Sequence, residues 1–131
     1  MGPAVKPYTE LDGFENVYLE ESYVLAIEAR PGTVSFELEV VLTPEHPEYA
    51  PPPLGIFACY REGRLDFEGV TYLEWSGQGS PPISDPSGKP DYGQIDAFGW
   101  DQSMFELEGE WGAMKISAAS VRIALHDGGD V

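Results

Sequence analysis

Few residues in this chain are suited to chemistry, and the most suggestive lie in the stretch TPEHPEYAPPP, residues 43–53. It holds His46, one of two histidines, between Glu45 and Glu48. The stretch could be a metal site, a proline-rich docking peptide or a rigid connection between strands. Pro47 disrupts the helix that would place spaced ligands on one face, and APPP is short for a polyproline ligand. We therefore favour the rigid connection.

The remaining catalytic inventory is small. His126 lies at the end of the last predicted strand, where a surface position is expected. Cys59 is the only cysteine, so no intrachain disulfide can form, and its apolar surroundings in GIFACY predict a buried structural thiol. No phosphate-binding loop, dinucleotide fingerprint or nucleophile elbow is present. We expect no catalytic residues, no cofactor and no metal, with a hydrolase that uses two carboxylates as the alternative.

A long loop rich in Gly, Pro and Ser, residues 76–93, is the next candidate for function. Aspartates lie in and beside it: Asp85, Asp91, Asp96 and Asp101. Oxygen-rich loops can hold calcium, but Asp85 is followed by Pro86, Ser87 and Gly88, which does not match a DxDxDG loop. We favour turn formation by these aspartates over calcium binding.

Aromatic residues near predicted strand ends could contact a ligand or a partner. They are Trp75, Trp100 and Trp111, joined by Tyr92 at the end of the long loop. Aromatic side chains on the rim of a β-sandwich can stack on sugars or anchor a protein. Packing in the core or at a sheet edge is the simpler interpretation. Asp85, Asp91 and Asp96 complete this set of candidate binding residues.

Charge sets limits on the partners. The chain has 131 residues, with 23 acidic and 7 basic side chains and a net charge of −16. This charge repels nucleic acid and anionic membranes and would attract a basic protein. No apolar run is long enough to span a bilayer or serve as a signal peptide. We expect a soluble, cytoplasmic protein.

These residues must be positioned by β-strands, because apolar and polar residues alternate along most of the chain. Residues 22–29 and 34–42 are predicted to form a hairpin around Pro31-Gly32, with a four-residue loop more compatible than a two-residue one. The predicted pairs are Ile27 with Phe36, Leu25 with Leu38, and Tyr23 with Val40.

Two further groups of strands are predicted downstream. Residues 55–75 should form a hairpin that turns at Glu62-Gly63, with a bulge at Gly69. Residues 104–126 should form a three-strand meander with turns at Trp111-Gly112 and Ala119-Ser120. The predicted pairs in the meander are Leu107 with Ile116, Glu108 with Lys115, and Ile116 with Ile123.

Together these elements predict an all-β fold of seven or eight antiparallel strands, in a sandwich or partly closed barrel, with a C-terminal three-strand meander. A single domain spans residues 1–131, with an N-terminal extension at 1–13, the long loop at 76–93 and a tail at 127–131. Exposed sheet edges would allow a homodimer, although glutamates on the polar faces oppose edge pairing.

Two stretches, GFENVYLEESYVLAIEA (13–29) and MFELEGEWGAMKISAASVRIAL (104–125), resemble a class of small acidic all-β bacterial proteins. Some of these proteins are similar to the immunity proteins of polymorphic toxin systems. The resemblance implies a bacterial, cytoplasmic protein that binds and neutralises a partner, and it carries no catalytic residues over. Our leading hypothesis is a non-enzymatic interaction protein. The alternative is a domain that binds a small molecule or carbohydrate at the 76–93 loop and the tryptophans.

Overall fold

The computed structural model describes residues 6–52, 54–55, 58–77, 83–84 and 90–126, and these residues form strands and one short 3-10 helix. The elements in chain order are β1 (Lys6–Pro7), η1 (Tyr8–Glu10), β2 (Val17–Arg30), β3 (Thr33–Leu42), β4 (Cys59–Glu68), β5 (Tyr72–Ser76), β6 (Ile83–Ser84), β7 (Pro90–Asp91), β8 (Ile95–Asp101), β9 (Met104–Gly109), β10 (Gly112–Ser117) and β11 (Ser120–Leu125).

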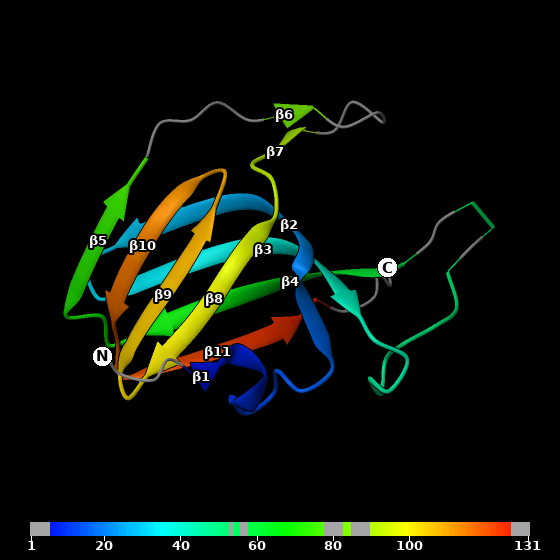
Figure 1. The fold of residues 1–131 in the computed structure, drawn as a ribbon, viewed down its shortest axis with the longest axis horizontal. Coiled ribbons are helices and arrows are strands. Elements are labelled where there is room, and N and C mark those ends of the chain that lie inside the picture. The colour runs from blue at the N-terminus through cyan, green and yellow to red at the C-terminus, as the bar shows by residue number, and fades with distance from the viewer. Residues whose placement is uncertain (1–5, 53, 56–57, 78–82, 85–89, 127–131) are drawn as a thin grey trace.

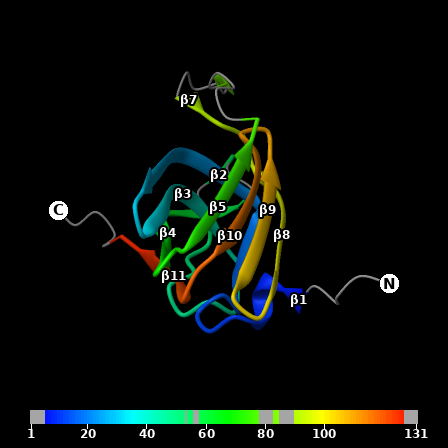
Figure 2. The same ribbon diagram turned by 90° about the vertical axis from the view of Figure 1, so that its left-hand side faces the viewer.

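Two antiparallel sheets pack face to face, as Figures 1 and 2 show from two directions. Sheet 1 has the strand order β1-β8-β9-β10-β5, and sheet 2 has the order β11-β4-β3-β2. The β6–β7 ribbon lies beyond one end of the sandwich. Eight strands of the described chain have five or more residues. The predicted all-β fold is therefore confirmed, and it is a sandwich and not a closed barrel.

The core lies between the sheets and is rich in aromatic rings. Alternation along β3 places Phe36, Leu38 and Val40 inward, and all three are completely buried, as predicted. Rings of the two sheets meet edge to face, with centroids 5.3 Å apart for Phe67 on β4 and Phe105 on β9. Such pairs add to the free energy gained from apolar burial. Cys59 is also buried at the start of β4, as expected.

The predicted hairpin in residues 55–75 is wrong, because β4 runs unbroken through Glu62-Gly63. Gly63 lies opposite Leu38 on β3 and opposite Leu125 on β11. A Cβ atom there would lie 2.8 Å from the carbonyl oxygen of Ala124, so this glycine permits a close approach of β11 and makes no turn. Gly69 follows the end of the strand with φ +65° and makes no bulge within it.

The first two strands of the predicted C-terminal meander form a hairpin, but its predicted turn and cross-strand pairs are wrong, and so is the place of the third strand. β9 and β10 form a hairpin, but Glu110 and Trp111 make its turn, so Leu107 pairs with Met114 and Glu106 with Lys115. β11 then crosses to sheet 2 and pairs with β4, where Arg122 faces Asp66. The apolar alternation of β11 fits either sheet, and local pattern alone could not choose between them.

The β2–β3 hairpin forms with a shorter loop than predicted, and it keeps the predicted register only from the loop to Ala26. Arg30 pairs with Thr33, so the loop has two residues, and Gly32 adopts φ +86°. The pair Ile27–Phe36 is confirmed. An irregularity between Val24 and Ala26 then shifts the register, giving the pairs Val24–Leu38 and Tyr23–Glu39. The shift turns Val24 into the core and Tyr23 to the outer face.

Contacts from the end of the predicted 76–93 loop accompany this irregularity. The Val24 amide donates a hydrogen bond of 2.8 Å to the Gly93 carbonyl, and the Tyr92 amide donates one of 2.8 Å to the Val24 carbonyl. Tyr92 is half-buried against the core. The backbone of β2 thus bonds to a segment leading into sheet 1, a long-range contact that its own sequence does not reveal.

Candidate interaction surface

The outer face of sheet 2 divides into an ion-paired half and a tyrosine-bearing half. Cross-strand registers on this face place Glu37 beside Arg64, and Ser35 beside Asp66. Two rows nearer the other end hold Tyr18–Val41–Tyr60 and Tyr23–Glu39–Glu62. Because alternate residues of a strand share a face, these rows lie side by side on the solvent side of the sheet.

Arg64 is the centre of the ion-paired half. Its guanidinium lies 3.0 Å from Asp66, 3.2 Å from Glu37 and 3.7 Å from Glu28. The hydrogen bond to Asp66 and the charge of that carboxylate raise the pKa of Arg64 above its ordinary value. Asp66 also accepts a hydrogen bond of 2.6 Å from Ser35. The charged and polar side chains of this half of the face therefore pair with one another.

All four arginines of the chain are paired in this way. Arg30 lies 2.8 Å from Glu28, Arg61 lies 2.9 Å from Glu48, and Arg122 lies 3.4 Å from Glu68. With 23 acidic residues in the chain, many carboxylates have no arginine to pair with. A partner approaching this protein meets an excess of negative charge.

The tyrosine-bearing half brings aromatic rings close to carboxylates. Tyr23 and Tyr60 have ring centroids 6.2 Å apart. Burial, the neighbouring Tyr23 and the carboxylates of Glu39 and Glu21 together raise the pKa of Tyr60, with burial the largest cause. Tyr23, Glu39 and Glu21 are thus close enough to Tyr60 to act on it electrostatically.

A hollow of about 350 Å³ opens beside these rows. We call it the tyrosine hollow; it is lined chiefly by Tyr18, Glu21, Val41, Thr43, Pro44 and Tyr49. Tyr18 is 45% exposed, which leaves its ring accessible. A neighbouring hollow of about 340 Å³ adjoins it at Ala58 and Cys59 and includes Tyr60 and the paired Glu48 and Arg61.

The connection between β3 and β4 forms one wall of both hollows. The amide of His46 donates to the Thr43 carbonyl at 2.9 Å, and that of Tyr49 donates to the His46 carbonyl at 3.0 Å. The His46 Nδ1 atom accepts a hydrogen bond of 3.0 Å from the Glu48 amide. His46 therefore stabilises a turn, and the predicted strand-to-strand connection is confirmed. Pro44, Pro51, Pro52 and Tyr49 of this connection also line concave surface, which sequence reasoning missed.

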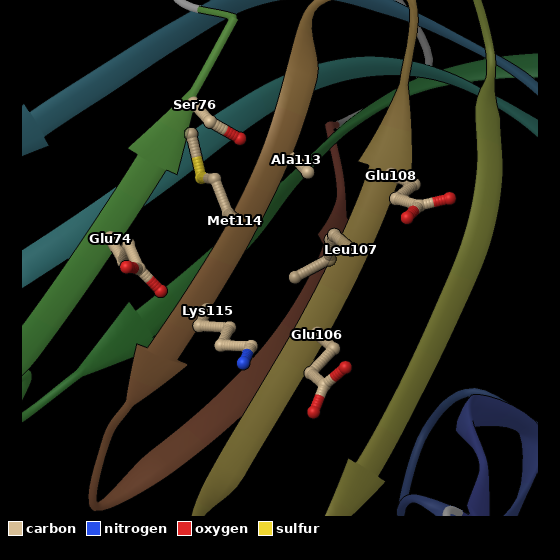
Figure 3. A pocket seen from close by; sticks show the side chains of 8 residues that line it. All are labelled: Glu74, Ser76, Glu106, Leu107, Glu108, Ala113, Met114 and Lys115. Atoms are coloured by element: carbon tan, nitrogen blue, oxygen red, sulfur yellow. The ribbon is translucent and has the colours of Figure 1, made fainter.

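A second groove, of about 270 Å³, lies on the outer face of sheet 1 (Figure 3). Lys115 on β10 is flanked across the strands by Glu74 on β5 and Glu106 on β9. Beside them, Ala113 lies opposite both Ser76 and Glu108. Small side chains account for the hollow, and acidic ones border it. Among the described residues, no aromatic side chain lines this groove, which distinguishes it from the hollow beside the tyrosine rows.

The three tryptophans predicted as binding residues do not form one exposed cluster. Trp111 is 2% exposed and packs on Phe36 of sheet 2, with centroids 5.3 Å apart. Trp75 is half-buried on β5 and donates to the Trp111 carbonyl at 3.1 Å. Trp100 is half-buried on β8, which two strands separate from β5, and it donates to the Pro7 carbonyl at 3.0 Å. Core and edge packing thus accounts for all three.

The acidic candidates and Tyr92 are also spread out. Tyr92 packs against the core, and Asp96 is exposed on β8. Asp91 belongs to β7, where it pairs with Ile83 of β6. Asp85 lies outside the described residues. Within the described chain, no three side chains of the His, Cys, Asp and Glu types are arranged to hold a metal ion.

The residues that form the tyrosine hollow were not predicted, although a signal exists. The stretch VYLEESY places Tyr18 and Tyr23 within a few residues of Glu21. Their common exposure on one face depends on the irregular segment between them. There the Ser22 hydroxyl donates to the Tyr18 carbonyl at 2.8 Å and accepts the Val41 amide at 2.9 Å.

In the described part of the chain, no helix has the length and apolar character of a membrane span.

Comparison with known proteins adds no relative to this picture. No protein-family model, curated protein or solved structure matches the chain. The fold and the surface themselves define the class of protein: an acidic antiparallel β-sandwich with an aromatic, carboxylate-bordered hollow on one sheet.

Proposed function

We propose that this protein is a non-enzymatic interaction module that binds a basic protein partner through the tyrosine-bearing half of sheet 2. The observation that carries the proposal is the tyrosine hollow, where exposed aromatic surface lies beside Glu21 and close to Glu39. Aromatic side chains supply large contact area at low entropic cost, and carboxylates select basic partners.

Charge supports the same partner chemistry. The net charge of −16 favours rapid association with a positively charged protein and slower association at high salt. Because the arginines of this chain are already paired with its own carboxylates, few cations compete for the acidic surface. Residues 13–29 and 104–125 resemble small acidic all-β bacterial proteins, some of them similar to immunity proteins. This resemblance also favours a protein partner, one that this chain would neutralise in the bacterial cytoplasm.

The proposal is tested by capture followed by reconstitution. The immobilised protein is exposed to lysate of its source cells, and the recovered protein is identified, purified and titrated at increasing salt. The test variant is Glu21→Gln/Glu39→Gln on sheet 2. The matched control is Glu106→Gln/Glu108→Gln on sheet 1, which changes the net charge by the same amount.

We expect the sheet 2 variant to lower the association rate and the affinity for a basic partner by about tenfold, and the control to change them by about twofold or less. If the two variants change the association rate and the affinity equally, the tyrosine-bearing half is not part of the interface. A recovered partner that is acidic, or whose affinity is insensitive to salt, would contradict the proposal.

The described residues give the tryptophans no common carbohydrate or small-molecule site, because Trp111 is buried and Trp100 lies on β8, separated from Trp75 on β5 by two strands.

A further inference from the structure

The tyrosine hollow has the composition of a receptor for one cationic side chain. Its walls combine the rings of Tyr18 and Tyr49 with the apolar surfaces of Val41 and Pro44, and Glu21 supplies a carboxylate. Tyr18 is exposed, and Val41, its cross-strand neighbour on the same face, is 7% exposed. The lining of the hollow thus combines apolar and aromatic side chains with one carboxylate.

We infer that this hollow receives an arginine side chain of the basic partner, in preference to lysine; this inference rests on the proposed function. A guanidinium is planar and weakly hydrated, so it loses little hydration when it stacks on a tyrosine ring, and it can hydrogen-bond a carboxylate at the same time. A lysine ammonium is compact and strongly hydrated, so burying it beside Val41 and Pro44 costs more.

A second copy of this chain does not fit as the occupant. Both copies carry a charge of −16, and all four arginines are held by carboxylates of their own chain. Any arginine entering the hollow from another copy would have to leave its ion pair. The occupant therefore comes from a different, basic polypeptide.

Two peptides of equal charge, hexa-arginine and hexa-lysine, serve as probes. Their dissociation constants for the whole protein are measured by fluorescence anisotropy at low and at physiological salt. The variants are Tyr18→Ala, which removes a wall of the hollow, and Tyr18→Phe, which keeps the ring. Tyr72→Ala on β5 is the matched control, since Tyr72 is 48% exposed on the other sheet.

We expect hexa-arginine to bind the wild-type protein several-fold more tightly than hexa-lysine. Tyr18→Ala should weaken hexa-arginine binding about three- to tenfold and abolish the preference, whereas Tyr18→Phe and Tyr72→Ala should preserve it. Circular dichroism confirms that each variant is folded.

The failures of the two proposals differ. Equal affinity for the two peptides would overturn the inference that the tyrosine hollow receives arginine. An equal loss of hexa-arginine affinity in Tyr18→Ala and Tyr72→Ala would do the same, and both results would leave only a general acidic surface. If neither peptide binds at low salt, the proposal of a basic partner fails, and the inference of an arginine site in the tyrosine hollow fails with it.

Discussion

The hydroxyl of Tyr8 donates a hydrogen bond of 2.5 Å to the carboxylate of Glu20. The same oxygen accepts the amide of Leu19 at 2.9 Å, and the ring stacks on Phe98 of sheet 1 with centroids 5.6 Å apart. One side chain of η1 thus joins the start of β2 to the opposite sheet. Residues 6–13 of the predicted N-terminal extension therefore belong to the folded structure, because β1 pairs with β8 and Tyr8 is buried.

Tyr8→Phe should destabilise the protein by about 1–3 kcal/mol, because it leaves the buried Leu19 amide and the Glu20 carboxylate without the hydroxyl. Chemical denaturation measures this change in the free energy of unfolding. Tyr18→Phe is the control, because it removes the same hydroxyl from an exposed ring and should change stability by under about 0.5 kcal/mol. Similar losses in both variants would contradict a specific role for Tyr8.

Alkaline pH should also weaken the fold through Tyr8. Burial, followed by the hydrogen bond to Glu20, raises the pKa of Tyr8 well above its ordinary value of about 10. Above pH 10 the unfolded chain releases this proton while the folded chain retains it, so the free energy of unfolding falls as pH rises. The stabilisation is complete below about pH 10 and is lost above it. In Tyr8→Phe the decline should be shallower; an identical pH profile would exclude Tyr8 as its cause.

Gly63→Ala should destabilise the protein by about 1–3 kcal/mol through overpacking. The new methyl group would lie 2.8 Å from the Ala124 carbonyl oxygen and 3.2 Å from Cδ2 of Leu125, so β11 must shift away from β4. Thermal unfolding measures the loss. The control, Ser120→Ala, changes an exposed residue of β11 and should have little effect. Wild-type stability in Gly63→Ala would show that β11 is not packed against this glycine.

Arg64→Gln should destabilise the fold, because the carboxylates of Asp66, Glu37 and Glu28 would repel one another without the guanidinium. The loss should shrink as salt is added, since these groups are partly exposed and screened. Denaturation at low and high salt measures both effects. Lys115→Gln is the matched control on sheet 1. A loss that does not depend on salt would indicate that Arg64 acts through packing of its aliphatic chain.

Trp111→Ala should cost about 3–5 kcal/mol, the range for removing a large buried aromatic side chain. Trp111→Phe should cost less than its volume change suggests, because the Nε1 atom of Trp111 is buried without a hydrogen-bond partner among the described residues. Unfolding monitored by circular dichroism compares the two variants. If Trp111→Phe destabilises the protein as much as Trp111→Ala does, the shape of the indole ring is required for packing.

The sequence by itself determined the fold class and the strands with strong alternation. The periodicity of β3, the β9–β10 hairpin and the position of the β3–β4 connection all follow from local pattern, because strand parity and turn residues act over a few neighbours. The buried Cys59 and the exposed His126 were predicted on the same grounds.

Only the tertiary structure decided which sheet each strand joins and where each face points. Gly63 looks like a turn in sequence, and it permits close packing of β11 only because that strand crosses to sheet 2. The irregularity in β2 exposes Tyr23 because its backbone bonds to Gly93, nearly seventy residues away. Long-range backbone pairing sets the register of a strand. A shift of the register by one residue moves buried side chains to the exposed face and exposed ones to the core. For that reason the tyrosine hollow was visible only after folding.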